Sequence, residues 1–139
     1  MKTINEKPEI SKKNPSHIPK QRYYELMHFC MQYNDWKKAL RRLDGWSIGS
    51  VDISGVIRRS GPSDPTERIA LARAYYSTHI DMVDRCIGEL DPVIAPYILK
   101  GVTENITYDD LRIKGCPCCR QVYYRWYRYF FWLLSKERQ

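Results

Sequence analysis

A long amphipathic stripe that begins after residue 64 is the feature that most constrains the fold of this chain. Its apolar residues recur every three or four positions, which places them on one face of an α-helix. They are Ile69, Ala72, Tyr76, Ile80, Val83, Ile87 and Leu90. The segment Asp64-Pro65-Thr66-Glu67 supplies a capping acceptor, a first-turn proline and a glutamate three residues after the cap. These signals predict a helix over about 64–90, which would be roughly 40 Å long at about 1.5 Å per residue.

A second stripe of the same kind precedes this helix and predicts another helix over about 21–43. Its apolar members are Leu26, Cys30, Tyr33, Trp36, Leu40 and Leu43. Gly45 is a suitable C-terminal stop, and residues 44–63 contain four glycines and a proline, which predicts a loop. A long helix with a narrow apolar stripe needs a partner helix. We expect the two helices to form an antiparallel hairpin; a second copy of the chain, giving a homodimer, is the alternative partner.

The segment before the hairpin, residues 1–20, has three prolines, five lysines and few apolar residues. This composition predicts a flexible basic arm.

The C-terminal third carries three further helix signals. Asp91-Pro92 predicts a short helix over 92–103, with Pro96 one turn inside, where it would cost a kink or a hydrogen bond. Thr107 and Asp110 form a capping box that opens a helix of two turns ending at Ile113. A glycine turn follows over 114–116, and a long final helix is expected to begin at Pro117. A short helix, a tight turn and a longer helix are the elements of a helix-turn-helix unit.

The final helix divides into an apolar and a basic face. We expect the apolar face to be buried, and it comprises Cys119, Val122, Tyr123, Trp126, Tyr129, Phe130, Leu133 and Leu134. The opposite face gathers guanidinium, amide and phenol groups in the first three turns. Such groups read base edges in the major groove, where Arg bonds guanine and Gln bonds adenine in bidentate fashion. The candidates for base reading are Arg120, Gln121, Tyr124 and Arg125.

Phosphate contacts would come from neighbouring cations. The candidates are Arg112, Lys114 and Arg128, together with Lys37, Lys38, Arg41 and Arg42 from the basic side of the 21–43 helix. The alternative interpretation is an ordinary helix with a solvated basic face. No acidic residue lies between Lys114 and Lys136. A solvated face usually mixes charges of both signs, so this run favours nucleic-acid binding.

The charge of the whole chain is unevenly distributed. Residues 1–63 carry 12 Lys and Arg against 6 Asp and Glu, residues 64–111 carry 4 against 9, and residues 112–139 carry 7 against 1. Basic ends beside an acidic middle favour a polyanionic partner, with simple solubility as the alternative. Residues 1–20 lack the apolar segment of a signal peptide, and no window approaches the roughly 18 apolar residues of a membrane span. We therefore expect a cytoplasmic protein without a membrane partner.

The cysteines and the remaining polar residues suggest no catalytic or metal site. Cys116, Cys118 and Cys119 are separated by one residue and then by none, whereas structural zinc sites use two separated pairs. Small buried apolar side chains are the better interpretation, and the odd number of cysteines fits a reducing cytosol. No paired carboxylates, phosphate-binding loop or Ser-His-Asp order is recognisable. We predict a protein that is not an enzyme and has no cofactor.

The segment "ITYDDLRIKGCPCCRQVYYRWYRYFFWLLSKER" resembles the C-terminal part of small phage and prophage proteins of the ArpU/RinA type in Firmicutes. The resemblance covers about the last third of the chain. These proteins are late-gene transcription regulators similar to region four of bacterial sigma factors. The residues that carry the resemblance are Pro117, Cys118, Arg120, Tyr124, Tyr127, Arg128, Phe130, Phe131, Leu133 and Leu134. The resemblance implies promoter or operator DNA as the ligand, with host RNA polymerase as a further partner.

Together, these observations predict an all-α protein with a long helical hairpin over 21–90 and a sigma-like helix-turn-helix unit over 91–139. The predicted function is that of a phage or prophage regulator that reads double-stranded DNA in the bacterial cytoplasm. The paired cysteines and the many aromatic residues leave an alternative open. In that alternative, the protein is a phage inhibitor that blocks a host nucleic-acid enzyme by protein contact, since Tyr, Trp and Arg are favoured at protein interfaces.

Overall fold

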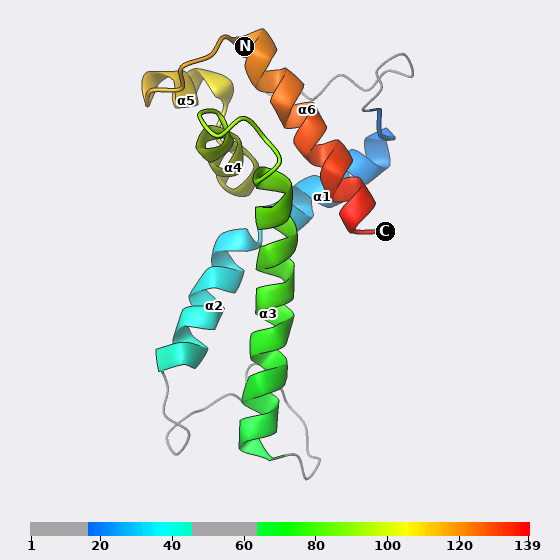
Figure 1. The fold of residues 1–139 in the computed structure, drawn as a ribbon, viewed down its shortest axis with the longest axis vertical. Coiled ribbons are helices and arrows are strands. Elements are labelled where there is room, and N and C mark those ends of the chain that lie inside the picture. The colour runs from blue at the N-terminus through cyan, green and yellow to red at the C-terminus, as the bar shows by residue number, and fades with distance from the viewer. Residues whose placement is uncertain (1–16, 46–63) are drawn as a thin grey trace. The chain divides into compact units, whose positions relative to one another are not determined.

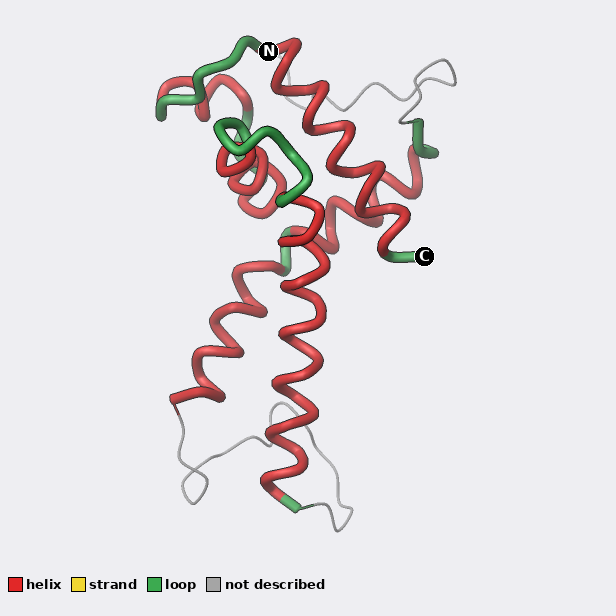
Figure 2. The backbone as a smooth tube through the Cα atoms, viewed as in Figure 1, coloured by secondary structure: helices red, strands yellow, loops and turns green. Residues whose placement is uncertain are grey.

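A computed structural model describes residues 17–45 and 64–139, and these residues form only helices and their connections (Figure 2). Helix accounts for 77% of them, with no strand in either range, so the predicted all-α class is confirmed. The helices are α1 (Lys20–Cys30), α2 (Tyr33–Gly45), α3 (Pro65–Ile87), α4 (Ala95–Glu104), α5 (Tyr108–Ile113) and α6 (Arg120–Glu137), as labelled in Figure 1. Residues 1–16 of the predicted arm and 46–63 of the predicted loop lie outside the described residues.

The chain divides into two compact units, which we describe separately. The larger unit contains the segments up to Gln32 and from Met82 onwards, and the smaller unit contains Tyr33–Asp81. This division differs from the predicted boundary between residues 90 and 91. The reason is that α1 packs against α4 and α6, so it belongs with the C-terminal helices.

The smaller unit is an antiparallel pair made by α2 and the first part of α3. Leu43, near the end of α2, is buried with Ile69 and Ala72, near the start of α3. Asp44 pairs with Arg73 at 2.8 Å in the same region. Further along, the rings of Trp36 and His79 lie 5.1 Å apart. These contacts run in opposite directions along the two helices, so the predicted hairpin pairing is confirmed for α2 and α3.

The prediction of one continuous helix over 21–43 is wrong, because the chain turns at Met31 and Gln32 between α1 and α2. The N–H of Met31 donates to the carbonyl oxygen of Met27, and the N–H of Gln32 donates to that of Phe29, both at 3.2 Å. The second bond spans only three residues, which tightens the last turn and ends α1. The apolar spacing continues across the two-residue turn, although α1 and α2 bury their stripes in different units. The spacing alone therefore concealed the break.

The start of α3 follows its sequence signal. The carboxylate of Asp64 accepts a hydrogen bond from the N–H of Thr66 at 3.2 Å, and Pro65 is the first helical residue. The helix ends at Ile87, three residues before the predicted end at Leu90.

The main core lies in the larger unit, where all the largest fully buried side chains are found. They are Leu26, Cys30, Val83, Ile98, Val102, Leu111, Tyr123, Phe130, Phe131 and Leu134, contributed by α1, α3, α4, α5 and α6. Ile18, in the part of the predicted arm that the structure describes, is 6% exposed, so the arm does not extend to residue 20.

In α4, one expectation from the sequence is corrected. The helix begins at Ala95, so Pro96 lies in its first turn, where no N–H is required. Gly101 is buried within α4, and a methyl group at its Cα would overlap the hydroxyl of Tyr123. The helix ends at Glu104, and its C-cap Asn105 adopts the left-handed conformation with φ of 56°.

Candidate nucleic-acid interface

The helix α5 and the turn after it set the position of the α6 N-terminus. Thr107 accepts a hydrogen bond from the N–H of Asp110 at 3.2 Å, which confirms the predicted cap of α5. Gly115 has φ of +113°, a conformation that side-chain-bearing residues rarely adopt. The hydroxyl of Tyr108 donates to the carbonyl oxygen of Cys118 at 2.6 Å. This contact holds the backbone outside the helix, so α6 begins at Arg120, with Cys119 as its N-cap, and the predicted start at Pro117 is wrong.

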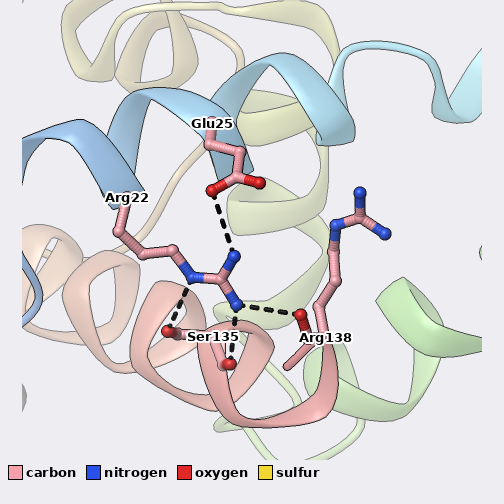
Figure 3. A network of polar contacts seen from close by, with 4 residues as sticks. All are labelled: Arg22, Glu25, Ser135 and Arg138. Atoms are coloured by element: carbon pink, nitrogen blue, oxygen red, sulfur yellow. Dashed lines mark hydrogen bonds and ion pairs between the residues drawn. The ribbon is translucent and has the colours of Figure 1, made fainter.

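The C-terminus of α6 is fixed by an arginine from α1 (Figure 3). Arg22 donates through Nε to the Ser135 hydroxyl at 3.1 Å, and through Nη2 to the carbonyl oxygens of Ser135 and Arg138, both at 2.9 Å. Its Nη1 pairs with Glu25 at 3.1 Å. The last carbonyl groups of a helix have no hydrogen-bond donors within the helix, and Arg22 supplies donors for them. No local sequence signal indicates this contact, which joins residues 113 positions apart.

The buried face of α6 is rotated relative to the predicted one. Tyr123, Phe130 and Leu134 are buried as predicted, but Phe131 is also fully buried. Its ring meets that of Tyr23 of α1 edge-on, at 5.1 Å. The predicted inward orientation is wrong for the other five residues of the predicted face. The helix is rotated so that the neighbouring stripe, which contains Phe131, faces α1 instead. Of the five, Cys119 is exposed, while Val122, Trp126, Tyr129 and Leu133 are half-buried.

Two of the four base-reading candidates are exposed on the outward side of α6. Gln121 and Arg125 are exposed and lie one helical turn apart, and Arg128, half-buried, follows within the next turn. The spacing of these three residues places them on one helical face. No acidic residue occurs in α6 before Glu137.

The other two candidates contact the protein itself. The guanidinium of Arg120 bonds Asp109 of α5 at 3.1 Å and lies 5.4 Å from the centre of the Tyr108 ring. Tyr124 is half-buried, and its ring contacts those of Tyr123 and Tyr127 at 4.9 and 5.3 Å.

The phosphate candidates fall into two groups. Arg112 and Lys114 are exposed at the end of α5, beside the turn that leads to α6. Apart from Arg128, which is half-buried on α6, the remaining candidates belong to α2 in the smaller unit and are exposed: Lys37, Lys38, Arg41 and Arg42.

A row of three aromatic side chains follows the polar face along α6, and we call it the aromatic row. It consists of Trp126, Tyr129 and Trp132, all half-buried. The ring centres of Trp126 and Tyr129 are 6.0 Å apart, and those of Tyr129 and Trp132 are 5.8 Å apart with the rings nearly parallel at 20°. The Lys136 ammonium lies 4.2 Å from the centre of the Trp132 ring.

The cysteines beside the α6 N-terminus differ in environment. Backbone N–H groups of Val122 and Gln121 point at the exposed Cys119 sulfur and lower the pKa of its thiol. Burial and a contact with the Cys116 sulfur at 3.8 Å raise the pKa of Cys118 to about 11. Over residues 17–45 and 64–139, no group of three or more His, Cys, Asp or Glu side chains is arranged to hold a metal ion.

The described residues thus define an all-helical protein whose C-terminal helix presents an exposed polar and basic face beside a row of aromatic rings. Comparisons with protein-family models, with curated proteins and with solved structures give no match for this chain. Within the same residues, every helix falls short of the combined length and hydropathy that crossing a membrane requires.

Proposed function

We propose that this protein binds double-stranded DNA through the outward face of α6 and acts as a transcription regulator. The observation that carries the proposal is the joint exposure of Gln121 and Arg125, with Arg128 on the same face. A guanidinium bonds guanine, and a primary amide bonds adenine, in bidentate fashion in the major groove. In this proposal, α5, the turn after it and α6 form a helix-turn-helix unit, and α6 is the recognition helix. The phage or prophage setting is supported by the sequence resemblance.

Electrostatics supports the same surface. Arg112 and Lys114 are exposed at the end of α5, before the turn that leads to α6, and α6 adds no acidic side chain before Glu137. Cations at these positions would neutralise phosphates and release counterions, which makes binding salt-dependent. Phosphate contacts of this kind fix the register of the protein on the duplex, while Gln121 and Arg125 would supply specificity.

Arg120 has a conditional role in this proposal, because its guanidinium is held by Asp109. To contact a base, Arg120 must exchange this carboxylate for guanine. Asp109→Asn removes the ion pair, and Asp110→Asn is the matched control, since it removes the same charge from the adjacent exposed position. If Arg120 reads a base, Asp109→Asn strengthens binding to the selected site more than Asp110→Asn does. Equal gains would mean that Arg120 serves only to hold α6 against α5.

The decisive experiment selects bound duplexes from a random pool with the purified protein and then measures affinity by fluorescence anisotropy at several salt concentrations. Gln121→Ala and Arg125→Ala should each lose about 1–3 kcal/mol and relax the preference at one base pair. Lys114→Ala should weaken all sequences alike and reduce the salt slope by about one. Lys100→Ala, an exposed position on α4 beside Glu104, is the control for a general loss of charge. Wild-type affinity and selectivity in both the Gln121 and Arg125 variants would refute the proposal.

Inhibition of a host nucleic-acid enzyme by protein contact is the second candidate function. The half-buried tryptophans and the exposed arginines of α6 favour it, because these residue types dominate binding energy at protein interfaces. A protein with this function would capture a host enzyme tightly and show no salt-dependent affinity for duplex DNA.

A further inference from the structure

The aromatic row of α6 lies at the edge of the core, although the sequence pattern places Trp126 and Tyr129 on the buried face. The fully buried aromatic residues of this helix are Tyr123, Phe130 and Phe131, whereas the three members of the row keep part of their surface in solvent. Each of these three rings has a large apolar area, so leaving part of all three in contact with water is unfavourable. The row therefore requires an explanation beyond the packing of the larger unit.

Basic side chains flank the row along α6, and the acidic residues Glu89 and Glu137 lie near its end, in a hollow that Lys136 also lines. Arg125 precedes Trp126 by one residue, Arg128 lies between Trp126 and Tyr129, and Lys136 lies over the ring of Trp132. Glu137 is the single acidic residue of α6, and its carboxylate is bound by Arg85 at 2.9 Å. A ligand for this surface must therefore offer flat or apolar groups together with negative charge.

A second copy of α6 would bring like charges together, which is unfavourable. Duplex DNA offers phosphates but keeps the faces of its bases stacked on one another. A single strand offers both features, because its phosphates are accessible and every base has a π-face that can stack on an aromatic side chain. The separation between positions 126 and 132, about 9 Å along the helix axis, accommodates a short run of bases.

We propose that the aromatic row, with Arg125, Arg128 and Lys136 at its edges, is a binding platform for single-stranded nucleic acid. Bases stack on Trp126, Tyr129 and Trp132, and the cations hold the phosphates. The platform goes beyond the proposed reading of duplex DNA, which uses the polar residues of the first turns of α6.

The test measures binding of a short labelled oligothymidine, and of the matching oligouridine, to the full chain by fluorescence anisotropy. Thymidine and uridine strands do not self-pair, so they present unpaired bases. Trp126→Leu and Trp132→Leu should each weaken binding about tenfold, which corresponds to about 1.4 kcal/mol. Tyr75→Leu is the matched control, since Tyr75 is an aromatic residue 55% exposed on α3 of the smaller unit, and it should bind as wild type does. Comparison of the two oligonucleotides distinguishes a DNA from an RNA strand.

A second measurement does not depend on the folding of any variant. Oligothymidine that carries iodouracil is cross-linked to the wild-type chain by ultraviolet light, and the adduct is located by mass spectrometry. The proposal requires the adduct on the aromatic row. It is overturned if the wild type does not bind the oligonucleotides, if both tryptophan variants bind normally, or if the adduct lies outside α6. It is also overturned if the tryptophan variants lose a host protein and keep the oligonucleotide, because the row is then a protein-binding surface.

The outcome is separable from that of the duplex proposal. Gln121→Ala should impair duplex selectivity and leave oligothymidine binding unchanged, whereas Trp132→Leu should have the opposite effect. Binding of the single strand through the row without any duplex binding would refute the proposed function and support the platform.

Discussion

The ring of Tyr123 in α6 closely approaches Gly101 of α4. The Tyr123 side chain is 1% exposed, and its hydroxyl is buried without a hydrogen-bond partner. The hydroxyl occupies the position that a β-carbon would take on Gly101 of α4. Glycine inside a helix is unfavourable by itself, so its presence here reflects the close approach of this ring.

Gly101→Ala should therefore destabilise the protein by about 1–3 kcal/mol, because overpacking outweighs the gain in helix propensity. Tyr123→Phe should cost little, since it removes an unpartnered buried hydroxyl. In the Tyr123→Phe background, Gly101→Ala should become much less harmful. Urea denaturation of the four proteins gives the coupling between the two sites. Additive effects of the two substitutions would contradict the predicted overlap.

The thiols offer a second prediction at the residue scale. Cys119 is exposed and its pKa is lowered, whereas burial raises the pKa of Cys30 and raises that of Cys86 to about 12. The thiolate is the reactive form, so iodoacetamide should modify Cys119 before any other cysteine of the native protein. The alkylation rate of Cys119 should rise with pH and level off at a pH below 9.0, the ordinary pKa of a thiol. The rate of Cys118 should continue to rise up to a pH of about 11.

Mass spectrometry of the intact protein over a series of pH values measures both rates. Modification of Cys30 or Cys86 ahead of Cys119 would show that the environment assigned to Cys119 is incorrect. The same reaction in urea is the control, since unfolding should make the five rates similar.

At the scale of single elements, local signals predicted the helices well. The caps supplied by Asp64 and Thr107 act within a few residues, so the starts of α3 and α5 could be predicted from the sequence. The start of α6 could not, because it depends on the hydroxyl of Tyr108, ten residues before Cys118. The break between α1 and α2 was concealed for a similar reason, since two helices of different units carry apolar stripes in the same register.

The candidate site was predictable in part. Exposure of Gln121 and Arg125 follows from their polarity, but the contact of Arg120 with Asp109 depends on the angle between two helices. The buried face of α6 was ambiguous because the helix carries aromatic residues on all its sides. Packing against Tyr23 of α1 decides which of two neighbouring stripes turns inward.

This rotation of α6 gives a prediction at the element scale. Phe131→Ala should destabilise the protein by about 3–5 kcal/mol, because it leaves a cavity in the core. Trp126→Ala should cost clearly less, although the side chain is larger, since Trp126 is only half-buried. Thermal or urea unfolding followed by circular dichroism compares the two variants. A larger loss for Trp126→Ala would indicate the orientation that the sequence alone predicts.

At the scale of the whole molecule, the first and last helices of the described chain are joined directly. Arg22 forms three hydrogen bonds to Ser135 and Arg138, and the Arg138 guanidinium in turn lies 4.0 Å from the centre of the Phe29 ring of α1. The hydroxyls of Tyr23 and Tyr127 are 3.1 Å apart in the same interface. These contacts close the larger unit around its core, although the chain between its two parts forms the smaller unit.

Arg22→Met keeps much of the aliphatic stem and removes all three bonds to α6. We expect a loss of about 1–3 kcal/mol, because the carbonyl groups at the end of α6 lose their donors. Hydrogen exchange should accelerate at the end of α6 more than in α3. Glu25→Gln is the control, since Glu25 is an exposed partner of Arg22 and should contribute little. Unchanged exchange in the Arg22 variant would show that these bonds do not fasten the two helices.

The joining of α1 to α6 also determines when the larger unit can form in a cell. Ser135 leaves the ribosome 113 residues after Arg22, which takes roughly 6–23 s at about 5–20 residues per second. Until then, the apolar side of α1 has no α6 to cover it, so the nascent chain is open to chaperones throughout that interval. The core of the larger unit can therefore close only after α6 has been synthesised.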